Sequence, residues 1–542
     1  MKNYLEKIFK EASQKLTFLS DVELMFEIPK TISHGDFSCN VAMMLTKKLK
    51  KNPRQIAEEI ISNLKYDEDI IQKIEIAGPG FINFFFTPSF MAKVIEHILT
   101  QKENYGRTEK YKGKKANVEF VSANPTGPLT VGHGRNAVIG DTVANMLEAI
   151  GYEVEREYYF NNAGRQMRVL GDSVKQRYLQ LLGKKINFPE DYYQGEYIKE
   201  IAGEMVKEFG DSLKNENPEG KFKEKAEGVI FNDIKKSLKL LGLEFDTFSN
   251  ENTLFEEGKI EALLSTFNKK NLSYEKDNAV WLKFTKLGGE QDKVIVKSSG
   301  EPTYRLPDIA YHITKFDRGY DLIVDVFGSD HAAAYPDVLA GLKALDYDTD
   351  KVKVLIYQFV TILEDGEVVK MSTRKANYVT LDELVHEVGS DVVRYFFNMR
   401  NTSSHMNFDL TLAKKQSDEN PVFYLQYAHA RICSILRTVV EENIVSSVEN
   451  LNLLVKEEEQ QLLKKLNKYE EEILYASENF EPHRICSYLE ELAAAFHKFY
   501  TFCRILGSEK KLAEARLALA EATKIVLQNG LGILGVTAPE RM

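Results

Sequence analysis

The sequence has few cysteines, and none of them is paired. Its 542 residues contain four cysteines, and no two stand in a Cys-x-x-Cys spacing; they are Cys39, Cys433, Cys486 and Cys503. Zinc ribbons and dithiol redox motifs need such a spacing, so both are disfavoured and no structural metal is expected. Unpaired thiols are typical of a reducing compartment, which predicts a cytoplasmic protein.

Long apolar runs are also missing. No stretch is long enough to cross a bilayer, so no contact with a membrane is expected. The first 16 residues, MKNYLEKIFKEASQKL, mix lysine and glutamate at helical spacing and lack the apolar centre of a secretory signal. Tandem repeats and low-complexity tracts are absent too. A chain with 43% hydrophobic and 28% charged residues is instead an ordinary globular one.

An overall excess of positive charge is lacking. The net charge is −10, which argues against a general binder of polyanions. Whole-chain charge can hide a local surplus, however. Residues 1–115 contain 19 lysines and arginines against 15 acidic residues, a local charge of +4. This surplus indicates, weakly, a contact with nucleic acid near the N-terminus.

The chain length favours about three or four domains. Residues 1–112 read as a small α/β domain, with a helical pattern over 40–64 broken at Pro53 and a strand–turn–strand pattern over 74–88. Residues 415–542 are helical in pattern to the end, which predicts an all-α domain.

Residues 113–414 read as an α/β domain with a parallel sheet. The order strand, loop, helix, strand, helix over 117–175 is typical of such sheets. A polar, mainly helical insertion is expected at about 185–275. Strand-like runs return after it, and the apolar runs at 321–328 and 353–360 suit strands buried on both faces.

One loop of the α/β domain has the features of a phosphate site. The strand NVEFVS ends at ANPTGP, where two prolines remove backbone donors and Gly127 frees the backbone. A helical pattern then opens near His133 and ends at Gly151. A helix start offers free N–H groups and a partial positive charge to an anion. The alternative is a core histidine on an ordinary strand–helix turn.

A second loop carries clustered cations. Residues 364–380 read EDGEVVKMSTRKANYVT, a glycine turn followed by Lys370, Ser372, Arg374 and Lys375. Cations on such a loop can neutralise the charge that develops on a phosphoryl group during transfer. The alternative is a solvated charged loop.

Together these two loops resemble the signatures of the class I aminoacyl-tRNA synthetases. TVGH (130–133) stands for the His-x-Gly-His signature, and KMST (370–373) for the Lys-Met-Ser-Lys loop. Thr130 replaces the first histidine and Thr373 the second lysine. The resemblance implies a Rossmann-like catalytic domain. It gives catalytic roles to Thr130, His133, Lys370, Ser372 and Arg374, and ATP-binding roles to Gly132, His133, Lys370, Met371 and Ser372.

The resemblance is closest to the arginyl members and covers nearly the whole chain, including TYRLPDIAYH, GSDHAAAYPDVL and NPVFYLQYAHARICSIL. A guanidinium needs carboxylates placed to accept its fork of donors. The resemblance implies seven substrate-binding residues: Glu119, Ser122, Asn124, Tyr304, Asp308, Asp330 and His331. The alternatives are structural: Glu119 pairing with a buried Arg135, Asp308 capping a helix, and Tyr304 lying in the core.

The resemblance also implies a reaction and partners. L-Arginine would attack ATP, supplied with Mg²⁺, to give arginyl-adenylate, and the arginyl group would pass to the 3′ end of tRNA(Arg). The helical domain would bind the anticodon, with Tyr424, Tyr427 and Arg431 near one face, although most of its aromatic residues are expected in the core. Residues 47–54, KKLKKNPR, would meet tRNA phosphates. A monomer is expected.

Two other functions stay open. A different class I synthetase, or a related nucleotidyltransferase, would have a neutral or metal-bearing amino-acid pocket. A non-catalytic RNA-binding relative would keep the fold and lose adenylate formation. Glu119 with Asp308 argues against the first, and the complete set of domains argues against the second.

Overall fold

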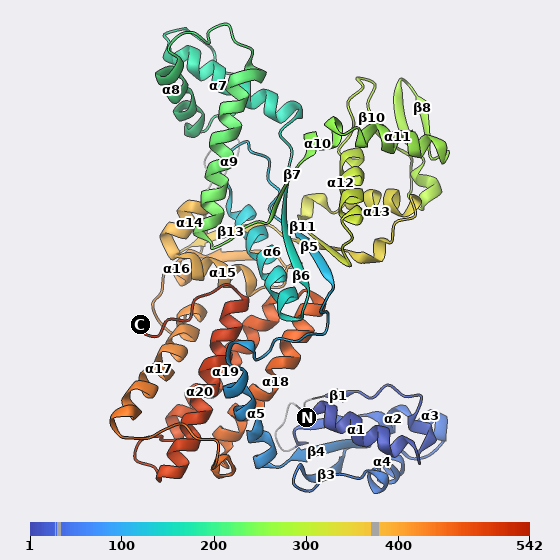
Figure 1. The fold of residues 1–542 in the computed structure, drawn as a ribbon, viewed down its shortest axis with the longest axis vertical. Coiled ribbons are helices and arrows are strands. Elements are labelled where there is room, and N and C mark those ends of the chain that lie inside the picture. Colours follow the sequence, from blue (N-terminus) through green and yellow to red (C-terminus); the bar gives the residue numbers. More distant parts are fainter. Residues whose placement is uncertain (28, 30–33, 370–378) are drawn as a thin grey trace.

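The structure is a computed structural model that describes residues 1–27, 29, 34–369 and 379–542. A parallel sheet lies at the centre, with a helical bundle on one side, a small α/β domain beside the bundle, and two further lobes at the other end (Figure 1). The prediction of signature residues Lys370 to Lys375 falls outside the described residues.

The N-terminal domain is built on an antiparallel sheet of order β1-β2-β4-β3. Its strands are β1 (Phe26–Glu27), β2 (Phe37–Cys39), β3 (Ile71–Ala77) and β4 (Phe81–Phe86), and its helices are α1 (Lys2–Ser13), α2 (Val41–Met44), α3 (Thr46–Leu49) and α4 (Pro53–Asn63). The expected break at Pro53 is the start of α4. Asn52 caps this helix, and its side chain accepts a hydrogen bond from Arg54 N at 2.9 Å.

The N-terminal domain is tied to the helical bundle. Helix α5 (Pro88–Gln101) leads away from it and packs on two bundle helices, and Tyr105 stacks on Tyr469 with 5.7 Å between ring centroids. Lys464 pairs with the buried Asp36 at 2.6 Å. These contacts place the domain beside the bundle rather than beside the central sheet (Figure 1).

The central sheet is five-stranded and parallel throughout, in the order β12-β11-β5-β6-β7. Its strands are β5 (Lys115–Glu119), β6 (Glu153–Phe160), β7 (Thr247–Asn250), β11 (Leu322–Gly328) and β12 (Val352–Tyr357). The chain runs outward from β5 through β6 and β7, then returns to add β11 and β12 on the other side. Ligands bind at such a switch point, beyond the carboxyl ends of the strands. The predicted Rossmann-like fold class is confirmed.

Two strands of this sheet differ from expectation. Strand β7 lies within the polar segment that was expected to be mainly helical, and β12 is an edge strand whose residues are mostly half-exposed. The prediction that 353–360 is buried on both faces is therefore wrong. It is right for β11, whose first five residues are buried.

The helices beside the central sheet are α6 (Val131–Ala149), α12 (Arg305–Asp317) and α13 (Tyr335–Ala344), while α7 (Gly164–Leu181) belongs to an outer lobe (Figure 1). Helix α6 is buried on nearly every side, because the sheet covers one face and the bundle another. Its end agrees with the expected stop, since Gly151 follows with a φ of 103°. The signature residues at its start are therefore held by a rigid element.

Gly140 shows how closely α6 meets the sheet. A Cβ atom on Gly140 would lie 2.2 Å from the ring of Phe120, whereas a Cβ on Gly203, in α8 (Glu196–Phe209), would meet nothing within 4 Å. We expect Gly140→Ala to lower stability by about 1–3 kcal/mol through overpacking. Gly203→Ala should instead stabilise by about 0.5–1 kcal/mol. Thermal unfolding of the two variants checks this, and equal effects would contradict it.

The two outer lobes extend from the central sheet (Figure 1). One contains α7, α8 and α9 (Lys223–Leu240). The other contains α10 (Glu251–Glu256), α11 (Lys259–Lys269) and an antiparallel sheet of β8 (Ser273–Lys276), β9 (Ala279–Leu282) and β10 (Lys293–Val296). The strand-like runs at 279–284 and 292–298 thus belong to a sheet of their own.

A third small sheet precedes the bundle. It joins β13 (Val360–Glu364), β14 (Glu367–Val368) and β15 (Met406–Asp409). Helices α14 (Leu381–Val388) and α15 (Ser390–Asn398) lie between β14 and β15 in the chain, and α16 (Leu410–Ala413) follows β15. The bundle consists of α17 (Pro421–Glu441), α18 (Glu457–Asn479), α19 (Pro482–Phe502) and α20 (Lys510–Ile533). The predicted helical C-terminal region is present. Within the described residues, no helix has the length and apolar character to span a membrane.

Candidate active site

The loop after β5 turns back on itself sharply. Val121 and Ser122 have φ values of 64° and 44°, unusual for residues with side chains and most of all for a β-branched one. Asn136 of α6 holds the turn by accepting a hydrogen bond from Val121 N at 2.6 Å. The turn brings the hydroxyl of Ser122 to Glu119, to which it donates at 2.9 Å. Strain retained in this way is typical of a functional site.

Thr130 caps α6 and orients His133. The ring atom Nδ1 of His133 accepts a hydrogen bond from Thr130 N at 3.1 Å, and His133 N donates to Thr130 Oγ1 at 3.5 Å. Burial lowers the pKa of His133, so its ring is neutral near pH 7. Because Nδ1 accepts, the proton lies on Nε2, which is available to donate to a ligand. Thr130 thus sets the tautomer of His133.

The start of α6 meets the chain that follows the second signature. Thr130 and Thr380 form an antiparallel bridge, and Leu381 N donates to Leu129 O at 2.9 Å. Lys370, Met371, Ser372 and Arg374 lie outside the described residues. The described residues after them nevertheless contact the helix that carries His133.

A cavity of about 560 Å³ opens at the carboxyl ends of β5, β6 and β11. Eight of the predicted site residues line it: Glu119, Ser122, Asn124, His133, Tyr304, Asp308, Asp330 and His331. Thr130 lines a neighbouring cavity instead, and Gly132 lines neither. Residues far apart in sequence therefore meet where an α/β sheet binds its ligand.

A buried ion cluster lies under the floor of this cavity. Lys315 of α12 donates to Glu119 at 2.6 Å and to Asp325 of β11 at 2.7 Å, and all three are buried. The alternative pairing of Glu119 with Arg135 is wrong, since Arg135 binds backbone carbonyls such as Gln358 O at 2.6 Å. Burial alone would lower the pKa of Lys315. Asp325 and Glu119 raise this pKa by more than burial lowers it, so it lies above its ordinary value.

His312 joins the same cluster from one turn earlier on α12. Its Nε2 lies 2.9 Å from Asp325 Oδ2, and its Nδ1 lies 2.7 Å from Asp308 O. Burial alone would lower the pKa of His312, but Asp325 raises it above the ordinary value. Burial alone would raise the pKa of Asp325. The positive charge of Lys315 lowers it by more, so the pKa of Asp325 lies below its ordinary range.

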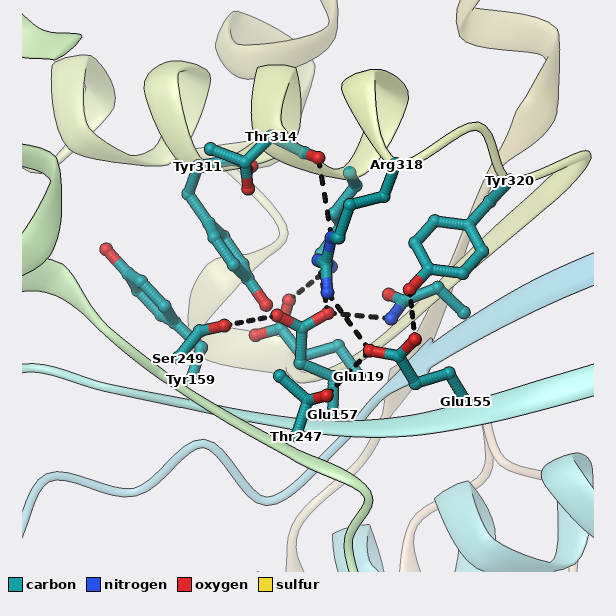
Figure 2. A network of polar contacts seen from close by, with 12 residues as sticks. Glu119, Glu155, Glu157, Tyr159, Thr247, Ser249, Tyr311, Thr314, Arg318 and Tyr320 are labelled. Carbon is teal, nitrogen blue, oxygen red and sulfur yellow. Dashed lines mark hydrogen bonds and ion pairs between the residues drawn. The ribbon is translucent and has the colours of Figure 1, made fainter.

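A second cluster satisfies the carboxylates of β6. Figure 2 shows Arg318 directed at Glu155 and Glu157, and its guanidinium donates to them at 3.1 and 2.6 Å. Tyr320 also donates to Glu155, and Ser249 of β7 donates to Glu157. With both clusters formed, Glu119, Asp325, Glu155 and Glu157 all have cationic partners.

Asp308 has no such partner. Its carboxylate makes no hydrogen bond or ion pair within the described residues, although it lines the cavity. Burial raises its pKa to about 7. It lies in the first turn of α12, after the helix has begun at Arg305, so the alternative of a helix cap is wrong. Tyr304 is 54% exposed and therefore no core residue.

The sequence did not reveal several cavity residues. Glu251, directly after β7, accepts hydrogen bonds from Tyr159 Oη at 2.9 Å and Asn161 Nδ2 at 2.7 Å, and burial raises its pKa. Tyr159 stacks on Tyr311 of α12 with 4.0 Å between ring centroids. Glu251 directly follows a strand, and residues at the carboxyl ends of parallel strands often line the ligand site. The sequence pattern did not reveal strand β7, so this signal for Glu251 was missed.

For three other predicted residues, the structure supports a substrate contact less clearly. Asn124 lines the cavity, but its side chain donates to Gln166 at 2.9 Å and accepts from Asn161 N at 3.0 Å. Asp330 and His331 are exposed, 3.7 Å apart, with the His331 ring stacked on Phe327. They form the outer wall rather than the floor.

The arrangement suits an organic cation beside a phosphate. Within the described residues, neither Glu251 nor Asp308 has a cationic partner, and two stacked tyrosines lie beside them in the cavity lining. Planar cations pair with carboxylates and stack on aromatic faces. His133 and the start of α6 offer donors to an anion at the opposite end.

The aromatic residues of α17 only partly follow expectation. Phe423 and Tyr424 are half-buried and Tyr427 is 44% exposed, so the expectation that most of these three residues lie in the core is wrong. Arg431 donates to Tyr500 Oη at 2.7 Å. Tyr427 stacks with His497, so this face of the bundle presents aromatic rings to solvent.

Comparisons with known proteins identify the family of this chain. Family models match residues 3–86 as an arginyl tRNA synthetase N-terminal domain, 94–411 as the catalytic domain of class I (R) tRNA synthetases, and 425–542 as a DALR anticodon binding domain. The chain is 50% identical to the arginine--tRNA ligase of Desulfotalea psychrophila over 95% of this chain and 94% of that protein. It is 48% identical to that of Salinibacter ruber over the whole of both.

A solved structure gives the same architecture. The arginyl-tRNA synthetase of Thermus thermophilus superposes with a TM-score of 0.79 at 20% identity, over 100% of both chains. At this identity the structural match shows the fold alone, and the family is shown by the sequence matches. The chain belongs to the arginyl-tRNA synthetases, a family of class I aminoacyl-tRNA synthetases.

Proposed function

We propose that this chain is an arginine–tRNA ligase acting in two steps. The arginine carboxylate attacks the α-phosphorus of ATP. The bond between that phosphorus and the oxygen that bridges it to the β-phosphorus breaks, and pyrophosphate leaves with the electron pair. The 2′-hydroxyl at the 3′ end of tRNA(Arg) then attacks the carbonyl carbon of arginyl-adenylate, and AMP leaves with the electron pair. Alignment and charge stabilisation suffice for both steps, so no side-chain nucleophile is required.

The carboxylate of Asp308 carries this proposal. It is half-buried, has no partner within the described residues and faces the cavity, and Glu251 accepts only from neutral donors. A guanidinium would supply the missing positive charge to both, in bidentate geometry. The neighbouring Glu119 is already neutralised by Lys315, so we assign it to positioning Ser122 rather than to direct contact.

The phosphates are assigned to the opposite end of the cavity. His133 would donate through Nε2, with Thr130 holding its tautomer and Gly132 letting the ligand approach the backbone. Lys370, Met371, Ser372 and Arg374 would approach the same phosphates, because Thr380 meets Thr130. Mg²⁺ would arrive with ATP, whose phosphate oxygens are its natural ligands.

The remaining assignments follow from the family. Asn124 would hold the α-amino and carboxylate groups of arginine, Ser122 would line the amino-acid site, and Tyr304 would contact the guanidinium. Asp330 and His331 would serve the substrate amine or the ribose. Residues 1–112, 113–414 with the insertion at about 185–275, and 415–542 would be tRNA-binding, catalytic and anticodon-binding domains. We expect a cytoplasmic monomer.

Citrulline tests the guanidinium assignment. It has the shape of arginine, but its ureido group carries no charge, so it leaves Asp308 and Glu251 unpaired. We expect arginine to protect the protein from thermal unfolding, and citrulline to require roughly a hundredfold higher concentration for the same shift. Equal protection by both would refute the assignment.

The affinity for arginine should rise with pH. Because burial raises the pKa of Asp308 to about 7, its carboxyl is protonated below that pH, and a guanidinium must displace the proton. The dissociation constant should therefore fall by about tenfold per pH unit up to about pH 7 and then level off. Calorimetry in buffers of different ionisation enthalpy should show proton release on binding. A pH-independent affinity would contradict this account.

A further inference from the structure

Helix α12 is connected to both ends of the amino-acid site. Asp308, the carboxylate assigned to the guanidinium, lies in its first turn, and Lys315 lies seven residues further along, about 10 Å along the helix axis. Lys315 is completely buried and does not line the cavity. The turn of residues 121–124, which carries Asn124, does line the cavity. Any effect of Lys315 on the substrate must therefore pass through this turn.

A chain of side chains connects Lys315 to the turn. Lys315 Nζ donates to Glu119 Oε2 at 2.6 Å, and Ser122 Oγ donates to Glu119 Oε1 at 2.9 Å. Ser122 Oγ in turn accepts a hydrogen bond from Tyr159 N at 3.2 Å. Each oxygen of Glu119 thus has its own partner, and the carboxylate lies between the central sheet and α12 (Figure 2). The ammonium of Lys315 therefore fixes where Glu119 holds the Ser122 hydroxyl.

The turn is strained, so it can relax when this chain is cut. Val121 and Ser122 have positive φ values, which persist only where neighbouring contacts enforce them. One such contact is the hydrogen bond from Val121 N to Asn136, and another is the bond from Ser122 to Glu119. A buried carboxylate that loses its cation takes up a proton or turns to another donor. Either change alters the bond to Ser122 and lets the turn move.

Helix α12, by contrast, is fixed against the sheet by two bonds to one residue. Asp325 of β11 accepts from Lys315 at 2.7 Å through one oxygen, and its other oxygen lies 2.9 Å from His312 Nε2. The helix cannot slide along β11 without breaking both contacts. Within the described residues, the distance between Asp308 and Ser122 is thus set by contacts that do not involve the substrate.

We propose that Lys315 is a positioning residue that fixes the length of the amino acid accepted by the site, an inference that rests on the proposed arginine–tRNA ligase function. Through Glu119, Lys315 holds the turn at one distance from Asp308. Arginine spans this distance, with its α-amino and carboxylate groups at the turn and its guanidinium at Asp308. L-Homoarginine has the same groups and one more methylene, so it cannot engage both ends at once.

The test compares arginine with L-homoarginine in the exchange of pyrophosphate into ATP, measured with tRNA present. The native enzyme should prefer arginine by about tenfold to two-hundredfold in kcat/KM, the usual effect of one methylene in a fitted pocket. In Lys315→Met this preference should shrink by about threefold or more, because the turn is no longer held at one distance. Lower activity with an unchanged preference would show a purely structural role and would overturn the proposal.

Arg318→Met is the matched control. Arg318 directly follows α12 and is also a cation that pairs with carboxylates, but its guanidinium donates to Glu155 and Glu157 of β6 rather than to the chain that reaches the turn. This variant should lose stability and keep the native preference for arginine. An equal loss of preference in Arg318→Met and Lys315→Met would overturn the proposal, since it would reflect a general loosening of the domain.

Glu119→Gln cuts the same chain with little change in size. It puts an NH₂ donor in place of one carboxylate oxygen, so the hydrogen bond from Lys315 or the one from Ser122 is lost. The preference should shrink as in Lys315→Met, and the double variant should shrink it no further, because both changes act on one chain. If Lys315→Met fails to fold, Glu119→Gln decides alone, and an unchanged preference there overturns the proposal.

Failure of the proposed function would look different. A native enzyme that supports no exchange with arginine would refute the ligase function. A native enzyme that exchanges equally well with arginine and L-homoarginine would leave that function standing and overturn the role of Lys315.

Discussion

Replacing Asp308 with alanine should raise the KM for arginine by roughly a hundredfold or more, while the KM for ATP changes little. Truncating one partner of a buried charge pair costs about 2–5 kcal/mol, which spans that range. Asp308 is the cavity carboxylate that has no hydrogen bond or ion pair among the described residues. Its loss therefore removes a ligand contact without breaking an internal one.

Kinetics with each substrate varied separately measure this change. Asp317→Asn is the matched control, because Asp317 lies on the same helix but is exposed at its far end. It should leave both KM values close to native. Equal losses for arginine and ATP in Asp308→Ala would show that Asp308 supports the fold of the site and does not bind the guanidinium.

Replacing Lys315 with methionine should lower the Tm by roughly 5 °C. The change leaves the buried Glu119 without its cation and leaves Asp325 with His312 alone, and breaking a buried pair in this way costs about 3–5 kcal/mol. Lys270→Met is the control, since Lys270 pairs with Asp346 at 2.6 Å on the exposed surface. That pair should contribute no more than about 1 kcal/mol.

The loss in Lys315→Met should depend on pH. The pKa of Asp325 is lowered in the native protein, so its contribution is complete above the ordinary aspartate range and fades as the pH falls toward the lowered value. The difference in Tm between native and variant should therefore shrink in acid. Calorimetry at about pH 6 and about pH 3 checks this. A variant as stable as Lys270→Met would show that the cluster is not formed.

The sequence predicts the fold best where local signals agree. Pro53 marks a break in a helical pattern, Gly151 a helix end, and the apolar run at 321–328 a buried strand, and all three are found. Edge strands carry weaker signals. Strand β7 has four residues in a polar segment, and β12 is as apolar as a central strand although one of its edges is free.

Long-range partners account for what the sequence could not show. Glu119 pairs with Lys315, 196 residues away, and nothing local distinguishes that lysine from Arg135 as a partner. Glu251 follows the strand that was not foreseen, so its place in the cavity was missed. Asp308 was identified by resemblance, but only the structure shows that its carboxylate has been left without a partner.

Thr130 illustrates a departure that the structure explains in part. As the cap of α6 it holds the Nδ1 atom of His133 as an acceptor, so Nε2 carries the proton toward the cavity. A threonine can therefore prepare the remaining histidine, even though it brings no charge of its own.

The most direct test of the account is exchange of pyrophosphate into ATP, measured with each amino acid in turn, with and without tRNA. Arginine should be the one amino acid that supports exchange, and the family resemblance predicts that tRNA raises the exchange rate. Exchange with another amino acid would contradict the guanidinium pocket. No exchange with any amino acid, despite tight binding of tRNA, would show that the chain kept the fold and lost the chemistry.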